Sequence, residues 1–201
     1  MKKRKFSMFI LLSFLLIQTN LHAEKPPASK AVGVFVAVGV GARVPVADFS
    51  NSTDLGYGLN LEASYSDSDH LPFFIFLRLG YEQFPGSQDF YKETDFSNYS
   101  TTILPISFGL RYYFSPMVES IVLLMPIVEG SVSYSYFHVL NEFKADAGKT
   151  NFTEDTWKFG GTIGAGLSMF MMEIMANYNY FDSNQYFSFN LNVRLPLFVN
   201  F

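Results

Sequence analysis

The last fifteen residues of the chain alternate between apolar and mostly polar side chains. Every second position is apolar: Phe187, Phe189, Leu191, Val193, Leu195, Leu197, Val199 and Phe201. Because successive side chains of a β-strand point to opposite faces, a period of two predicts a strand with one apolar face and one polar face. The sequence therefore ends on an amphipathic strand whose final residue is aromatic.

The same period of two recurs upstream, and eight such segments can be counted. They lie at about 32–44, 55–65, 73–81, 104–114, 128–136, 157–169, 172–180 and 187–201. The connections at about 45–54, 85–99 and 139–156 are long and polar, whereas those at 67–70, 115–119 and 170–171 are short. An even number of strands with long outer and short inner connections is typical of a membrane barrel. We expect an all-β fold over residues 32–201, an eight-stranded antiparallel up-and-down transmembrane β-barrel.

Residues 1–23 have the features of a secretory signal peptide, with basic residues at 2–5 and an apolar stretch at 6–17. That stretch is shorter than the ~20 residues a membrane helix needs. Residues 24–31 are interpreted as a short periplasmic N-terminal tail. Removing the signal peptide leaves ten basic and eighteen acidic residues, a net charge of −8. An acidic surface argues against nucleic acid as a partner.

Several charged residues fall on the face that the alternation assigns to the barrel interior. An interior of ~8 strands is just wide enough for side chains to fill, and buried charges are tolerated only when they are paired. We therefore expect a Glu–Arg network inside the barrel. For Arg43 and Lys158, which lie near strand ends, a solvated position at the rim is an equal alternative. The predicted network comprises Arg43, Glu62, Arg78, Glu82, Arg111, Glu129, Lys158, Glu173 and Arg194.

Two segments carry a resemblance to a known family. They are the C-terminal alternation ending in Phe201, and the first hairpin, Gly41-Ala42-Arg43-Val44-Pro45 followed by Asp48-Phe49-Ser50. Both resemble the eight-stranded bacterial outer-membrane β-barrels, of which the OmpA and OmpX barrels are familiar examples. The resemblance implies export to the outer membrane, contact with its lipids, assembly by the barrel-assembly machinery through the C-terminal strand, and a monomer. No peptidoglycan-binding domain is expected after the barrel, and the resemblance gives an architecture without a fixed task.

Catalysis is not expected. A lipid-modifying enzyme at the outer rim would need a nucleophile, a base and an orienting acid within hydrogen-bond reach. Of the histidines, only His138 is suitably placed, with Ser133, Ser135 and Glu142 as its nearest candidates. The alternation points His138 outward and both serines inward, which is a poor geometry. The acidic connections show no metal-ligand spacing, and no cofactor is predicted.

The expected function is a structural, envelope-integrity or surface-interaction role through the outer connections. The segments 85–99 and 140–155 combine acidic residues with Phe90, Tyr91, Phe96, Phe143 and Phe152, which either grip a partner or pack on the rim. One alternative is a narrow or gated channel for small solutes. Another is a soluble lipocalin-like barrel, in which the apolar face lines a ligand cavity.

Overall fold

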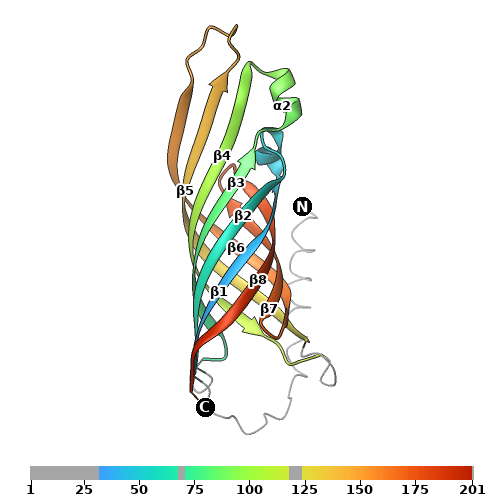
Figure 1. Ribbon diagram of the computed structural model, residues 1–201, viewed down its shortest axis with the longest axis vertical. Coiled ribbons are helices and arrows are strands. Elements are labelled where there is room, and N and C mark those ends of the chain that lie inside the picture. Colours follow the sequence, from blue (N-terminus) through green and yellow to red (C-terminus); the bar gives the residue numbers. More distant parts are fainter. Residues whose placement is uncertain (1–31, 68–70, 118–123, 201) are drawn as a thin grey trace, which may run out of the picture.

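The computed structural model describes residues 32–67, 71–117 and 124–200 (Figure 1). The expected signal peptide, the N-terminal tail and Phe201 lie outside the described residues. Eight strands close into a barrel in which each strand pairs antiparallel with the next and β8 pairs with β1. The strands are β1 (Val32–Val46), β2 (Gly56–Asp67), β3 (Phe74–Pro85), β4 (Phe96–Tyr113), β5 (Leu124–Phe143), β6 (Phe152–Met169), β7 (Met172–Phe181) and β8 (Gln185–Asn200). The predicted fold class is confirmed.

The two faces of the strands meet opposite environments. Val38 and Val40 on β1 are 59% and 52% exposed, whereas Glu62 and Arg111 retain only 2% and 1% of their accessible surface. Apolar side chains thus cover the outside, and charges fill the inside, as a barrel surrounded by hydrocarbon requires. The lipocalin-like alternative is therefore wrong, because its apolar face would be the buried one. Among the described residues, no helix has the length and apolar content to cross a bilayer.

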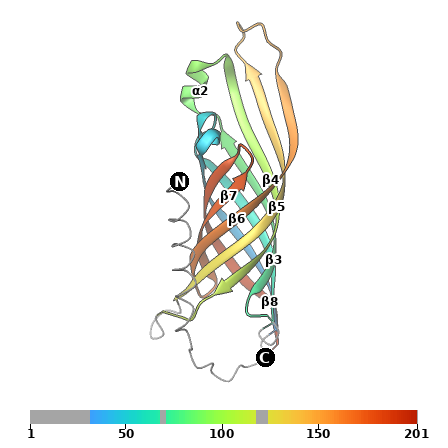
Figure 2. The same ribbon diagram turned by 180° about the vertical axis from the view of Figure 1, so that it is seen from behind.

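The three longest strands are neighbours in the barrel. β4, β5 and β6 have 18, 20 and 18 residues, whereas β7 has 10. A tilted strand crosses the bilayer in about 9–11 residues, so these three extend well beyond it. Figures 1 and 2 show them rising above the remainder of the barrel at the end that carries the helix α2 (Gln88–Glu93). We call this the outer end, and the opposite end the inner end.

These long strands correct the predicted outer connections. β4 starts at Phe96, and β5 and β6 stay paired as far as Asn141 and Phe152, so the connections shrink to 86–95 and 144–151. The alternation fails as a signal here because both faces of a sheet above the bilayer meet water. Two short helices within the outer connections, α2 and η2 (Ala47–Asn51), were also not predicted.

The C-terminal strand departs from the predicted alternation at its inner end. Val34 pairs with Phe198 but Phe35 pairs with Pro196, so Leu197 is an extra residue in a β-bulge. One extra residue moves the following side chains to the other face. Phe198, predicted to face inward, is 60% exposed, whereas Val199 pairs with the inward-facing Gly33. The outward series from Phe187 holds to Leu197, which is 68% exposed, and Phe198 joins it on the exposed side.

Candidate functional site

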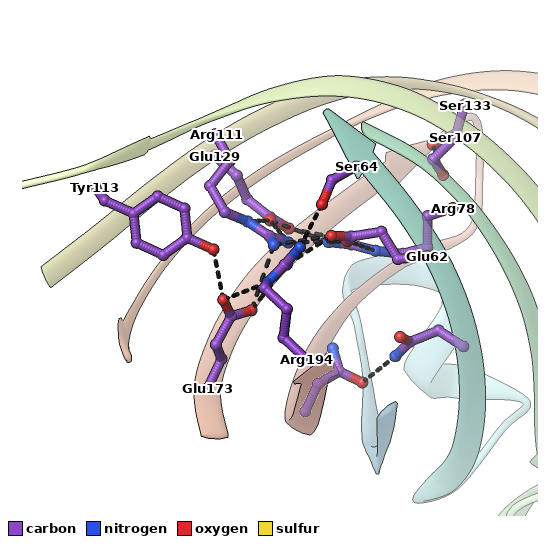
Figure 3. Close-up of polar contacts among 12 residues, drawn as sticks. Glu62, Ser64, Arg78, Ser107, Arg111, Tyr113, Glu129, Ser133, Glu173 and Arg194 are labelled. Carbon is purple, nitrogen blue, oxygen red and sulfur yellow. Dashed lines mark hydrogen bonds and ion pairs between the residues drawn. The ribbon is translucent and has the colours of Figure 1, made fainter. Parts of the chain in front are cut away.

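A central charge cluster occupies the barrel interior (Figure 3). Each of six strands contributes one side chain: Glu62 (β2), Arg78 (β3), Arg111 (β4), Glu129 (β5), Glu173 (β7) and Arg194 (β8). The Arg111 guanidinium lies in the middle and donates hydrogen bonds to Glu62, Glu129 and Glu173, with N–O distances from 2.5 to 3.3 Å. Three arginines therefore balance three glutamates away from water.

The other two arginines complete the cluster. Arg78 donates to Glu62 at 2.7 Å and to Glu129 at 2.9 Å. Arg194 donates to Glu62 and Glu173, each at 2.7 Å. The Tyr113 hydroxyl donates to Glu173 at 2.5 Å and belongs to the same group, although the sequence did not single it out. Every carboxylate accepts from at least two donors, which is the condition under which buried charges are tolerated.

The remaining members of the predicted network lie elsewhere. Arg43 donates to Glu82 at 2.8 Å, and these two buried side chains form a separate pair. Lys158 donates to the backbone carbonyl of Asp182 at 2.8 Å and to the side chain of Asn184. The structure thus divides the predicted network into a cluster and a pair, and it does not bring Lys158 into either.

The interior is packed along its length. Between the pair and the cluster, a cavity of about 30 Å³ lined by residues such as Asn60, Ser107 and Ser188 has room only for water. Toward the inner end, the Phe74 ring contacts Phe35 and Tyr113 at centroid distances of 5.6 and 4.8 Å. The outer end is filled by a buried apolar group comprising Phe49, Phe84, Ile103, Phe137, Phe181 and Tyr186. Among the described residues, side chains therefore fill the barrel interior from the Phe74 ring to the apolar group at the outer end.

The outer end carries a second candidate site, which we call the protruding sheet: residues 96–103 of β4, 135–143 of β5 and 152–159 of β6 (Figure 2). On it, Phe96 stacks between Phe90 of α2 and Phe143 of β5, at centroid distances of 5.3 and 4.6 Å. Tyr99 and Phe152 contact the ends of this row. The aromatic residues of the predicted loops therefore form one cluster on ordered elements.

Hydrogen bonds tie the tip of the sheet to the neighbouring helix. The Lys144 ammonium donates to the backbone carbonyls of Tyr91 and Thr94 at 2.9 and 2.7 Å. The Lys149 ammonium donates to Asp95 at 2.8 Å, and this contact lowers the pKa of the Asp95 carboxyl. The first turn of α2 is capped by the Ser87 hydroxyl, which accepts from the backbone N–H of Phe90. The tip is thus held in a defined shape before any partner binds.

One edge of the protruding sheet has no neighbouring strand. β7 pairs with β6 only from Gly160 to Met169, whereas β5 pairs with β6 up to Phe152. In the part of the chain that the structure describes, residues 152–159 of β6 therefore pair on one side only. Such an edge leaves backbone N–H and C=O groups free to pair with an added strand.

His138 lies on the outward face of the protruding sheet, but its partner differs from those considered in the sequence. Its Nδ1 lies 2.6 Å from Asp155, the residue directly opposite on β6. Hydrogen bonds from the Tyr136 hydroxyl, and then from His138, lower the pKa of the Asp155 carboxyl. Only the β5–β6 register, which the sequence does not reveal, could have identified this pair.

The other candidates for catalysis are engaged elsewhere. Ser133 shares a hydrogen bond of 2.7 Å with Ser107 inside the barrel, and Ser135 is fully buried. Glu142 accepts from the Asn98 amide at 2.9 Å. A nucleophile, a base and an acid are therefore not brought together from the residues that the sequence proposed. Within residues 32–67, 71–117 and 124–200, no group of three or more His, Asp or Glu side chains is arranged to hold a metal ion.

Comparison with known proteins identifies the fold of this chain but no sequence relative. No family model matches the sequence, and no curated protein is significantly similar to it. Among solved structures, the Neisserial surface protein A is 13% identical with a TM-score of 0.51, over 83% of this chain and 99% of that one. Ail of Yersinia pestis, in complex with the heparin analogue sucrose octasulfate, is 12% identical with a TM-score of 0.46, over 84% and 100%. The outer membrane enzyme PagL is 15% identical with a TM-score of 0.42, over 81% and 99%.

Identities this low bear on architecture and leave activity open. The closed eight-stranded topology, the apolar exterior and the similarity to Neisserial surface protein A agree with one another. The chain has the fold of the eight-stranded outer-membrane β-barrels.

Proposed function

We propose that this chain is an integral protein of a bacterial outer membrane that binds a partner through its protruding sheet. The apolar exterior supports the membrane placement, because large aliphatic and aromatic side chains exposed on every strand would be unfavourable in water. The barrel then serves as a rigid support in the envelope, with the central charge cluster and the aromatic packing as its core.

The free edge of β6 is the observation that carries this proposal. Residues 152–157 are all exposed, and their outer backbone groups are available to an extended segment of a partner polypeptide. The aromatic cluster and the lysine contacts hold the sheet in place, so binding would require little ordering of the tip.

A channel and an enzyme are both less well supported. The packed interior offers no path for a solute, which argues against the channel. The residues considered for catalysis are separated between the two faces of the wall, which argues against a rim-located lipid-modifying enzyme. We therefore place the function in the surface contact rather than in transport or chemistry.

The test is to shorten the protruding sheet without altering the barrel. Because Val139 pairs with Glu154, replacing residues 140–153 by Asn-Gly leaves a two-residue hairpin of favoured type. Cells expressing this variant are expected to lose attachment to immobilised polypeptides that retain cells expressing the unaltered protein. Heat-modifiable migration on gels should show that the barrel still folds.

A matched control shortens the neighbouring outer connection, between β7 and β8. Replacing residues 182–184 by Asn-Gly alters the contacts of Lys158 with this connection but keeps residues 140–153 and the free edge at 152–157, and it is expected to preserve attachment. If attachment is unchanged after removal of residues 140–153, the proposed surface role is wrong.

A further inference from the structure

The connection between β6 and β7, at the inner end, is short and entirely apolar. It is a two-residue turn, Phe170 and Met171, enclosed by Met169 and Met172, which pair with each other. We call these four residues the Phe170 turn. Phe170 is 74% exposed and Met171 53%. The β2–β3 connection is polar at 66–70, with Ser, Asp and His, whereas the β4–β5 connection at 114–123 contains Ser115, Glu119 and Ser120 among apolar residues.

The backbone of the turn does not favour a phenylalanine. Phe170 has φ 54, in the left-handed region that suits Gly or Asn. Ser183, in the outer turn between β7 and β8, has nearly the same conformation, with φ 61, and carries a polar side chain. A bulky residue in this region is strained, and such strain persists where the surroundings or a function require it. Because the backbone conformation does not favour phenylalanine at position 170, we infer that an interaction of the phenyl ring explains why phenylalanine occurs there.

The Phe170 turn also lies less far toward the periplasm, along the membrane normal, than the inner end of β8. Tyr178 on β7 pairs with Phe187 on β8, and their rings are in contact at a centroid distance of 5.2 Å. Because aromatic side chains gather at the boundaries of a barrel's lipid-facing surface, we take these rings as its outer boundary. A strand tilted by ~45° advances about 2.4 Å per residue along the membrane normal, so Phe170 lies about 19 Å below Tyr178, within an apolar band about 25 Å tall. The neighbouring strand β8 continues to Asn200, which the same rise per residue places about 31 Å below Phe187.

The register and the views agree with this difference in depth. β7 pairs with β8 only as far as Val193, and the rest of β8 pairs with β1 alone. In Figure 1, the turn between β6 and β7 lies higher than the lower end of β8. The inner rim of the barrel is therefore slanted, with its short side at β6 and β7.

We propose that the Phe170 turn lies among the acyl chains of phospholipids in the periplasmic leaflet, where Phe170 and Met171 anchor the short side of the barrel. The patch is continuous with the lipid-facing surface, because Met172 pairs with Val193 and Leu167 pairs with Ile174, and all four are exposed. No residue from Leu167 to Met172 is charged. The inference rests on the membrane placement proposed above.

Two features at the Phe170 turn are consistent with a location in the hydrocarbon of the membrane. The Met171 carbonyl accepts a hydrogen bond of 2.7 Å from the backbone N–H of Arg194, which satisfies a polar group that lipid could not. The next residue, Glu173, belongs to the central charge cluster and is 1% exposed. An apolar turn seated in lipid keeps periplasmic water away from this carboxylate.

Tryptophan fluorescence in vesicles tests the depth of the turn. Trp157 is the sole tryptophan, so a Trp157→Phe background is free of other signals. Phe170→Trp is introduced into the purified full barrel in phosphatidylcholine vesicles with brominated acyl chains. The expected result is a blue-shifted emission that is strongly quenched by the brominated chains and insensitive to aqueous iodide. Met171→Trp provides a second reporter if Phe170→Trp fails to fold.

Tryptophan at two further positions distinguishes a failure of the proposed anchor from a failure of the proposed membrane placement. Leu191→Trp, on the lipid-facing side of β8, should be quenched by the brominated chains. Ser183→Trp, in the matched left-handed outer turn, should be quenched by iodide. If position 170 behaves like position 183 while position 191 is quenched by lipid, the anchor is refuted and the membrane placement stands. If position 191 is not quenched by lipid, the membrane placement fails and the anchor fails with it.

Discussion

Arg111 and Glu62 are joined by two parallel hydrogen bonds, Nη1 to Oε1 at 2.8 Å and Nη2 to Oε2 at 2.9 Å. They lie on β4 and β2, which have β3 between them, so the contact reaches across the barrel interior. Bidentate arginine–carboxylate pairs are both strong and directional. The charge cluster therefore links strands that share no backbone hydrogen bonds.

Removing Arg111 should strongly destabilise the barrel. In Arg111→Met, Glu62 and Glu129 each lose a buried donor, and breaking a buried ion pair costs about 3–5 kcal/mol. Urea-induced unfolding of the barrel in lipid vesicles measures the change. Lys158→Met is the control: its ammonium donates to Asp182 and Asn184 at the rim and lies 5.1 Å from the centre of the Phe137 ring, and a change of about 1 kcal/mol or less is expected. Equal stability of Arg111→Met and the unaltered protein would refute a stabilising role for the cluster.

Because its interior is packed with side chains, the barrel is expected not to conduct ions. In planar bilayers the protein should give no conductance steps under conditions that open a control porin. The double variant Phe84→Ala with Phe137→Ala should also stay silent, because the Arg43–Glu82 pair and the charge cluster lie below the apolar group. Reproducible single-channel steps from the unaltered protein would restore the channel as a candidate function.

The His138–Asp155 contact predicts an acid-sensitive tip. The pKa of Asp155 in the folded protein lies below its ordinary value of 3.8 because of the Tyr136 and His138 hydrogen bonds. A depressed pKa means that the contact contributes fully above that ordinary value and is lost as the pH falls through the lowered one. Amide exchange near residues 136–156, corrected for the intrinsic pH dependence, should accelerate as the pH falls below 3.8.

The isosteric variant Asp155→Asn provides the control for this acid sensitivity. It keeps the shape of the side chain but cannot titrate, so the acceleration of exchange at low pH should be smaller in this variant than in the unaltered protein. An equally steep acid response in Asp155→Asn would assign the effect to other groups.

Much of the barrel followed from local chemistry. The period of two placed Val38 and Val40 toward lipid and Glu62 and Arg111 inside, because a strand directs successive side chains to opposite faces whatever its partners. The near balance of inward glutamates and arginines followed from the same assignment. Above the bilayer the alternation no longer identifies strands, and the outer ends of β4, β5 and β6 were wrongly predicted as connections.

The contacts of the interior could not be obtained in this way. Whether Arg111 meets Glu62 depends on the register of β2, β3 and β4 and on barrel closure, which bring residues 49 positions apart within hydrogen-bond distance. The same holds for Asp155 opposite His138, and for the bulge at Leu197 that turns Phe198 outward.

The sequence by itself determined which side of each strand meets lipid, because side-chain direction is a property of the local backbone. Only the tertiary structure decided which charges pair, where the sheet protrudes and how deep the Phe170 turn lies. Those outcomes depend on how far each strand slides along its neighbours before the ring closes, and that offset is a property of all eight strands together.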